Sequence, residues 1–148
     1  MFETVVTATD GSDSAERGVR TALDLAGRFD ATVHALYVVD TGELRSTPSE
    51  VRDDLREAIR TAGDEALSFV RSEAEAAGDD IITAVREGDP STEIIEYAGE
   101  VDADVIALGT RGRHGEHAFL LGSVAEDIVR RAPMPVLTVR QLGGDETA

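Results

Sequence analysis

Short apolar runs rich in β-branched residues alternate with amphipathic segments along the whole chain, and this alternation most constrains its fold. Runs with strand character lie at residues 3–8, 32–39, 81–85, 105–108 and 136–139. The segments between them repeat apolar residues every three or four positions, which is typical of helices that pack on one face. The pattern predicts an α/β protein, a doubly wound sheet of five parallel strands flanked by about four helices.

Capping residues mark where some of these helices begin. Asp13, with Glu16 three residues later, is predicted to form a capping box at the first helix. Thr47 is expected to cap the long second helix, with Pro48 in its first helical position. Residues 40–47 are interpreted as a polar connection between the second strand and that helix.

The charge balance excludes several classes of protein. Asp and Glu number 30 against 14 basic residues, for a formal net charge of -16. Such a surface repels nucleic acid, so no nucleic-acid partner is expected. All the basic residues are arginine, and the lack of lysine excludes P-loop NTPases, Schiff-base enzymes, kinases and receiver domains. The composition favours a halophilic protein, because molar salt screens the repulsion. An ordinary acidic protein is the alternative.

Length and hydrophobicity indicate one domain in the cytoplasm. The 148 residues suffice for one core. No cysteine is present, which excludes disulfide scaffolds, thiol catalysis and cysteine-bound metals. No apolar run approaches the roughly 20 residues of a membrane helix, and the chain opens directly into a strand-like run. We therefore expect no signal peptide and no membrane partner.

A glycine-rich loop follows the fourth strand and is the strongest candidate site. Gly109 and Gly112 are followed, after nine residues, by Gly122 and Ser123. Glycines allow a ligand to approach the backbone closely, and Ser123 is expected to cap a helix whose N-terminus would attract an anion. Ligands of such sheets bind beyond the carboxyl ends of the strands, where Asp10 also lies. The pattern favours phosphate binding, and a merely flexible connection is the alternative.

Five segments, taken in order, resemble the universal stress protein family. They are VVTATDGS at residues 5–12, LYVVD at 36–40, GTRGRHG at 109–115, LLGSVAEDIVRRAP at 120–133 and PVLTVR at 135–140. Together they extend over essentially the whole chain. The resemblance implies an adenine nucleotide alpha hydrolase-like fold with the strand order 3-2-1-4-5. It also implies a single domain over residues 1–141, followed by a disordered tail at 142–148.

The family's ATP-binding subgroup keeps both loop glycines and the final Gly-Ser pair. Transferred to this sequence, the implied nucleotide-binding positions are Ala8, Thr9, Asp10, Val38, Leu108, Gly109, Arg111, Gly112, Arg113, Gly122, Ser123 and Val124.

The resemblance also assigns roles within this set. Asp10 would face the ribose and a metal–phosphate group, with Mg²⁺ as the implied metal, and the backbone of Val38 would contact adenine. The bound nucleotide would be ATP, ADP or AMP. Relatives often have a basic residue near Ala118, and here Arg111 and Arg113 are the residues that can supply that charge.

Three functions remain open from the sequence. The first is a nucleotide-dependent regulatory or protective protein of the stress response. The second is a slow ATP-hydrolysing enzyme, since no general base is evident and no catalytic residue is assigned. The third is an interaction protein with a vestigial site, which the intact glycines disfavour.

Two further expectations concern the last strand and the histidines. Pro133 and Pro135 lead into a β-branched edge strand, and family members commonly form homodimers through it, which removes an open edge. His114 and His117 are too few to indicate a zinc site and are interpreted as surface or phosphate-proximal residues. His34 is interpreted as a packed or edge histidine within the second strand.

Overall fold

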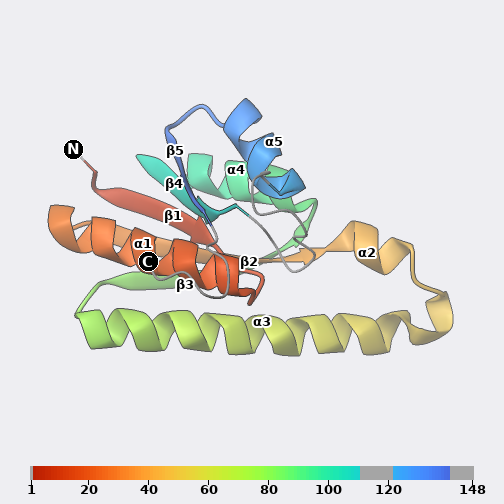
Figure 1. The fold of residues 1–148 in the computed structure, drawn as a ribbon. Helices are drawn as coiled ribbons and strands as arrows, with labels where there is room; N and C mark the ends of the chain where they lie inside the picture. Colours follow the sequence, from red (N-terminus) through yellow and green to blue (C-terminus); the bar gives the residue numbers. More distant parts are fainter. Residues whose placement is uncertain (1, 111–121, 141–148) are drawn as a thin grey trace.

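Five parallel strands form one sheet in the order β3-β2-β1-β4-β5 in the computed structural model, which describes residues 2–110 and 122–140. The strands are β1 (Thr4–Ala8), β2 (Thr32–Asp40), β3 (Ile81–Gly88), β4 (Val105–Gly109) and β5 (Val136–Val139). The helices are α1 (Asp13–Phe29), α2 (Thr41–Arg45), α3 (Ser49–Ala77), α4 (Pro90–Glu100) and α5 (Ser123–Arg131). The predicted doubly wound sheet and its strand order are confirmed (Figure 1).

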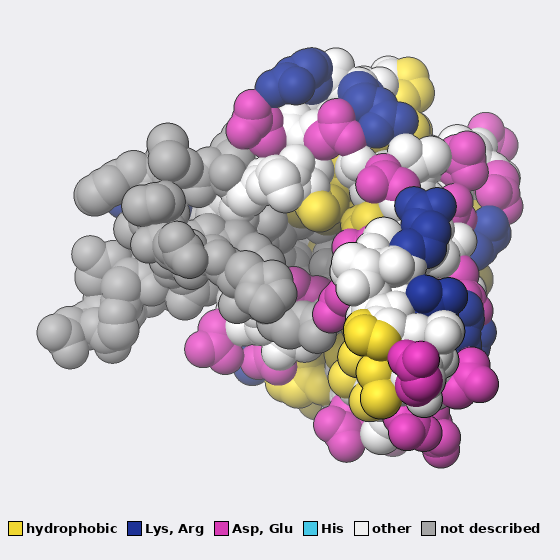
Figure 2. Space-filling model, turned by 90° about the vertical axis from the view of Figure 1, so that its right-hand side faces the viewer, with side chains coloured by type: hydrophobic (Ala, Val, Ile, Leu, Met, Phe, Trp, Pro, Cys, Tyr) yellow, Lys and Arg dark blue, Asp and Glu magenta, His cyan; other side chains and the backbone are white. Residues whose placement is uncertain are grey.

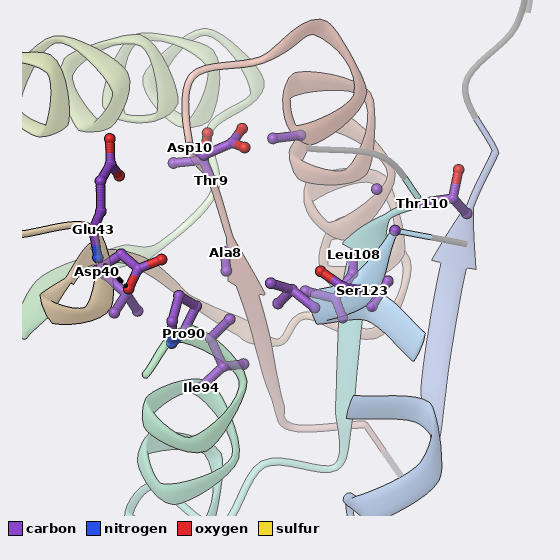
Figure 3. A pocket seen from close by; sticks show the side chains of 16 residues that line it. Ala8, Thr9, Asp10, Asp40, Glu43, Pro90, Ile94, Leu108, Thr110 and Ser123 are labelled. Atoms are coloured by element: carbon purple, nitrogen blue, oxygen red, sulfur yellow. Dashed lines mark hydrogen bonds between the residues drawn. The ribbon is translucent and has the colours of Figure 1, made fainter. Parts of the chain in front are cut away.

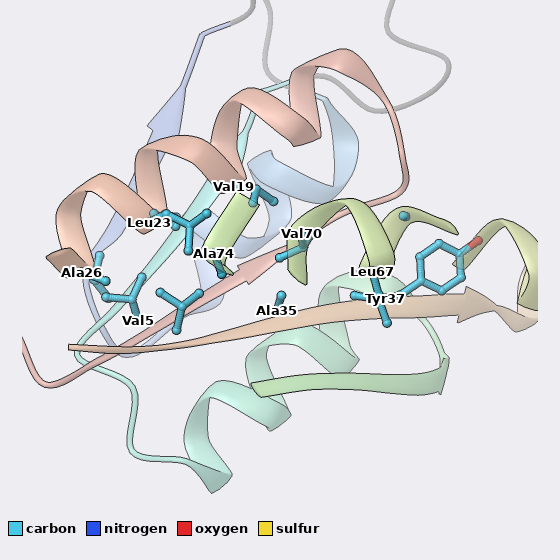
Figure 4. Packing of buried hydrophobic residues seen from close by; sticks show 14 of the residues in the cluster. Val5, Val19, Leu23, Ala26, Ala35, Tyr37, Leu67, Val70 and Ala74 are labelled. Atoms are coloured by element: carbon cyan, nitrogen blue, oxygen red, sulfur yellow. The ribbon is translucent and has the colours of Figure 1, made fainter. Parts of the chain in front are cut away.

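The sheet is the middle of three layers. Helices α1 and α3 cover one face, while α4 and α5 cover the other (Figure 1). Successive strand residues point to opposite faces, so Val5 joins the core beneath α1 and α3 while Val6 joins the core beneath α4 and α5. Figure 4 shows Val19 of α1 and Val70 of α3 packed over the first of these faces. Burial on both faces explains why the strands read as nearly continuous apolar runs.

The central strand β1 brings together segments that lie far apart in the sequence. It pairs with β2 from Thr4↔Thr32 and with β4 from Val5↔Val105. The Thr7 hydroxyl donates a hydrogen bond of 2.8 Å to the Ala107 carbonyl. Because all strands are parallel, the carboxyl ends of β1, β2 and β4 meet at one edge of the sheet.

The starts of α1 and α3 differ from the expected caps. Ser12, not Asp13, caps α1, because its side chain accepts the Ala15 N–H at 3.2 Å and Asp13 is already helical. Helix α3 begins at Ser49 after Pro48, with no side-chain cap. The Thr47 hydroxyl instead donates to the Glu43 carbonyl at the end of α2. The polar connection over residues 40–47 therefore contains a short helix that the sequence analysis missed.

Charged side chains are spread over the surface of the molecule. Figure 2 shows acidic side chains, with arginines between them, over the side of the molecule on which α2 lies. Within residues 2–110 and 122–140, every helix is too short or too polar to cross a membrane. The tail predicted to be disordered, residues 142–148, lies outside the described residues.

Candidate functional site

A cavity of about 360 Å³ opens at the carboxyl ends of β1, β2 and β4 (Figure 3). Its size is typical of small-molecule sites. Nine of the predicted positions line it together: Ala8, Thr9, Asp10, Val38, Leu108, Gly109, Gly122, Ser123 and Val124. The other three, Arg111, Gly112 and Arg113, lie outside the described residues, as do His114 and His117.

The loop after β1 holds Asp10 at the cavity by local hydrogen bonds. Thr9 is buried, and its N–H donates to the Leu36 carbonyl of β2 at 3.0 Å. The Thr9 hydroxyl accepts the Gly11 N–H at 3.0 Å, and the Asp10 carboxylate accepts the Ser12 N–H at 2.9 Å. These turns fix the half-buried carboxylate at the mouth of the cavity before α1 begins.

The N-terminus of α5 differs from the other helix starts around the cavity. Ser123 is the first helical residue and does not cap α5 as expected, since Gly122 occupies the cap position and has no side chain. The first hydrogen bond within α5 runs from the Glu126 N–H to the Gly122 carbonyl. The N–H groups of Ser123, Val124 and Ala125 therefore have no partner within the helix. Together with the helix dipole, they form a place that favours an anion.

The other helices that line the cavity have side-chain caps at their N-termini. Ser12 caps α1, Asp40 caps α2 and Asp89 caps α4. Hydrogen bonds from the Thr92 hydroxyl and N–H lower the pKa of Asp89, so this cap stays ionised at neutral pH. Among the helices that line the cavity, α5 alone begins without a side-chain cap within the described residues.

The ends of the glycine-rich loop are anchored beside this helix start. The Gly122 N–H donates to the Thr110 carbonyl, and the Thr110 N–H donates to the Val139 carbonyl at 3.1 Å. Thr110 and Gly122 therefore lie side by side, next to the end of β5.

Gly109 also has a packing role that the sequence did not indicate. A Cβ atom built on Gly109 would lie 2.2 Å from the Ser14 carbonyl oxygen of α1. A Cβ on Gly18 of the same helix would lie 2.6 Å from the Gly109 nitrogen. Both glycines permit the close approach of α1 to β4, so their small size is required whatever the cavity holds.

The wall opposite α5 contains residues that the sequence analysis missed. Pro90 and Ile94 of α4, Asp40 at the end of β2 and Glu43 of α2 also line the cavity (Figure 3). One signal could have identified part of this wall, because a helix beginning at Pro90 directly after the third strand must start at the same sheet edge. The two carboxylates on this wall make the cavity mouth acidic.

The described residues hold no ready-made metal centre. Among them, no group of three or more His, Asp or Glu side chains is placed to bind an ion. Mg²⁺ commonly uses only one or two carboxylates and completes its shell with phosphate oxygens and water. Asp10 therefore fits Mg²⁺ as a single protein ligand beside a phosphate group. His34 lies elsewhere, with its Nδ1 2.8 Å from the Tyr97 hydroxyl.

Comparisons with known proteins agree with this architecture. Residues 1–140 match the universal stress protein family. The chain is 40% identical over 142 residues to a universal stress protein of Methanocaldococcus jannaschii, covering 95% of this chain and 84% of that protein. It is 30% identical to the Bacillus subtilis universal stress protein YxiE, covering 95% of this chain and 100% of that protein.

Two solved structures that resemble the chain contain nucleotides. A universal stress protein in complex with cAMP has a TM-score of 0.68 and 31% identity, covering 94% of this chain and 97% of that one. The universal stress protein from Archaeoglobus fulgidus in complex with dAMP has a TM-score of 0.69 and 26% identity, covering 95% and 98%.

Proposed function

Because the chain belongs to the universal stress protein family, we propose that it binds an adenine nucleotide in the cavity at the ends of β1, β2 and β4. The phosphates lie at the N-terminus of α5, the ribose beside Asp10, and the base between Val38 and the α4 wall. The resident ligand is ATP, ADP or AMP. The predicted nucleotide-binding residues are retained in this proposal, including Arg111, Gly112 and Arg113.

The uncapped start of α5 carries this proposal. Ser123, Val124 and Ala125 line a cavity whose other helix starts have side-chain caps, and their N–H groups have no partner within α5. An anion that accepts these N–H groups gains charge-assisted hydrogen bonds and the favourable end of the helix dipole. The cAMP and dAMP complexes of the relatives support a nucleotide phosphate as that anion.

The opposite end of the cavity suits a flat base. Val38, Pro90 and Ile94 supply apolar surface there, and Val38 belongs to a strand whose backbone ends at the cavity. A purine would bury its faces against these side chains and leave its polar edge for backbone groups. The cavity volume of about 360 Å³ lies within the range of small-ligand sites.

The acidic side chains at the cavity mouth favour a ligand that includes a divalent cation. Asp10, Asp40 and Glu43 are the titratable side chains among the described lining residues, and they repel a polyphosphate. Mg²⁺ between Asp10 and the phosphates would remove that repulsion. Arg111 and Arg113 would contribute further positive charge.

We place the activity in regulation or protection during stress, not in fast catalysis. Asp10 and Asp40 both accept backbone N–H groups in turns or caps, which holds them in place and favours binding over proton transfer. The proposal includes a cytoplasmic homodimer that pairs through β5.

Nucleotide released from the purified protein tests this function directly. Mass spectrometry should detect an adenine nucleotide after denaturation, and calorimetry in molar KCl should show that ATP with Mg²⁺ binds more tightly than GTP with Mg²⁺. Asp10→Asn should reduce the effect of Mg²⁺ on affinity more than it reduces the affinity for AMP. A folded protein that releases no nucleotide and binds neither AMP nor ATP would refute the proposal.

A further inference from the structure

A partly buried hydrogen bond joins α4 to α5 beside the cavity. Ser91 is the second residue of α4 and is only 5% exposed. Its hydroxyl lies 2.5 Å from Oδ2 of Asp127 in α5. Arg131, one turn further along α5, donates to the same carboxylate at 2.7 Å. The link thus connects two neighbouring helices that both line the cavity.

The Ser91 hydroxyl lies within hydrogen-bond distance of two carboxylates, and Asp127 is nearer to it than Asp89. Oδ2 of Asp89 lies at 3.0 Å, but this oxygen already accepts the Thr92 hydroxyl at 2.9 Å and the Thr92 N–H at 3.2 Å. Asp127 offers the shorter distance. Hydrogen bonds from Ser91 and Arg131 lower the pKa of Asp127, so the bond is between a hydroxyl and a carboxylate ion.

Both ends of the link lie within about one helical turn of the cavity lining. Ser91 adjoins Pro90 of the apolar wall, and Asp127 follows the uncapped residues 123–125 of α5. The buried apolar residues of α5 are only Ala125 and Ile128 within its described span. Ala125 and the fully buried Ile128 pack this nine-residue helix without directional bonds. The hydrogen bonds from Ser91 to Asp127 and from Arg131 to Thr92 are directional and fix α5 relative to α4.

We propose that Ser91 and Asp127 are positioning residues for phosphate binding, because their hydrogen bond holds the N–H groups of α5 at a fixed place relative to the α4 wall. This inference rests on the proposed function of the cavity. Neither side chain contacts the ligand. Loss of this hydrogen bond would misplace the N–H groups that bind the phosphate. The apolar surface of Val38, Pro90 and Ile94, which is proposed to contact the base, would stay intact.

Two ligands that differ only in the phosphate separate this role from general stability. Ser91→Ala and Asp127→Ala should each weaken AMP binding at least about fivefold, while the affinity for adenosine changes less than about twofold. The double variant should bind AMP no more weakly than Asp127→Ala alone, since Ser91 and Asp127 share one bond. Asp127→Asn keeps an oxygen that can accept the Ser91 hydrogen and should recover part of the affinity.

Glu126→Ala is the matched control. Glu126 adjoins Asp127 and forms the same kind of i,i+4 ion pair, with Arg130, but within the described residues it forms no hydrogen bond or ion pair with α4. This variant removes one negative charge from α5 and should bind AMP at least as well as the wild type. Circular dichroism and thermal unfolding establish that each variant is folded.

The outcomes distinguish this inference from the proposed function. If the wild type binds AMP but the folded Ser91→Ala and Asp127→Ala variants bind it equally well, the positioning role is wrong. Equal losses for AMP and adenosine would also overturn it, because they would indicate a general disturbance of the cavity. If the wild type binds no nucleotide, the proposed function itself fails.

Discussion

Replacing Ser123 by proline removes one backbone N–H from the proposed phosphate site without an obvious cost to folding. Ser123 is the first helical residue of α5, where the N–H is not needed by the helix and proline is favoured. Gly122 already has the extended conformation, φ -65° and ψ 158°, that a following proline prefers. We therefore expect the unfolding free energy of Ser123→Pro to lie within about 1 kcal/mol of the wild-type value.

The effect on binding should be much larger than the effect on stability. A hydrogen bond to a charged group contributes about 1.5–3 kcal/mol, so losing one N–H from the phosphate should weaken AMP binding roughly tenfold to a hundredfold. Ser123→Ala is the control, because it removes the same hydroxyl and keeps the N–H. Calorimetric titration of both variants in molar KCl makes the comparison.

A folded Ser123→Pro protein that binds AMP as tightly as Ser123→Ala would refute the reasoning. The phosphate would then have to be held elsewhere, and the uncapped start of α5 would need another explanation. Adenosine provides the internal reference, since its affinity should be nearly the same in both variants.

Four further predictions concern packing, protonation, salt and assembly. Gly109→Ala should lower the unfolding free energy by about 1–3 kcal/mol or more, because its Cβ atom would collide with Ser14. The control Gly99→Ala, whose Cβ would have no atom within 4 Å, should be neutral or stabilising. Equal unfolding midpoints of the two variants would contradict this prediction. Burial lowers the pKa of His34. Its contribution to stability is therefore complete above the unfolded-state pKa of about 6.5 and declines as the pH falls below that value. Urea unfolding of the wild type and of His34→Gln between pH 8 and 5.5 measures this, and the same pH dependence of the unfolding free energy in both proteins would disprove it. The net charge of -16 predicts a higher unfolding midpoint in about 2 M KCl than in dilute buffer, and equal midpoints would count against a halophilic protein. Light scattering at high salt should give a dimer mass, and a monomer at all micromolar concentrations would exclude pairing through β5, where Leu137 is 39% exposed.

The sheet could be predicted from the sequence because buried parallel strands leave a strong local signal. Helix α2 could not, since five residues including Gly42 are too few to show a helical period. The cap of α1 was misplaced by one residue because Ser12 and Asp13 are both good capping residues. The backbone decides between them, as the Ser12 N–H is already held by Asp10 before the helix begins.

The site residues that belong to a recognisable motif were predicted, and those on α4 and α2 were missed. The glycine spacing and the family resemblance identified residues after β1 and β4. Pro90, Ile94 and Glu43 were missed because no motif marks them, although α4 and α2 follow β3 and β2 directly and so begin at that edge. The contact between Gly109 and Ser14 is likewise a matter of helix packing, which sequence spacing does not reveal.

The central place of β1 has a consequence for how the chain matures during translation. Its partner β4 follows about 100 residues later, as the bond from Thr7 to Ala107 shows. At synthesis rates of roughly 5–20 residues per second, β1 waits about 5–20 seconds with one edge unpaired. The high contact order makes closure of the sheet a late event. The start of α5 is made later still, so the proposed nucleotide site forms only after α5 has been synthesised, and until then the open edge of β1 is exposed to pairing with other strands.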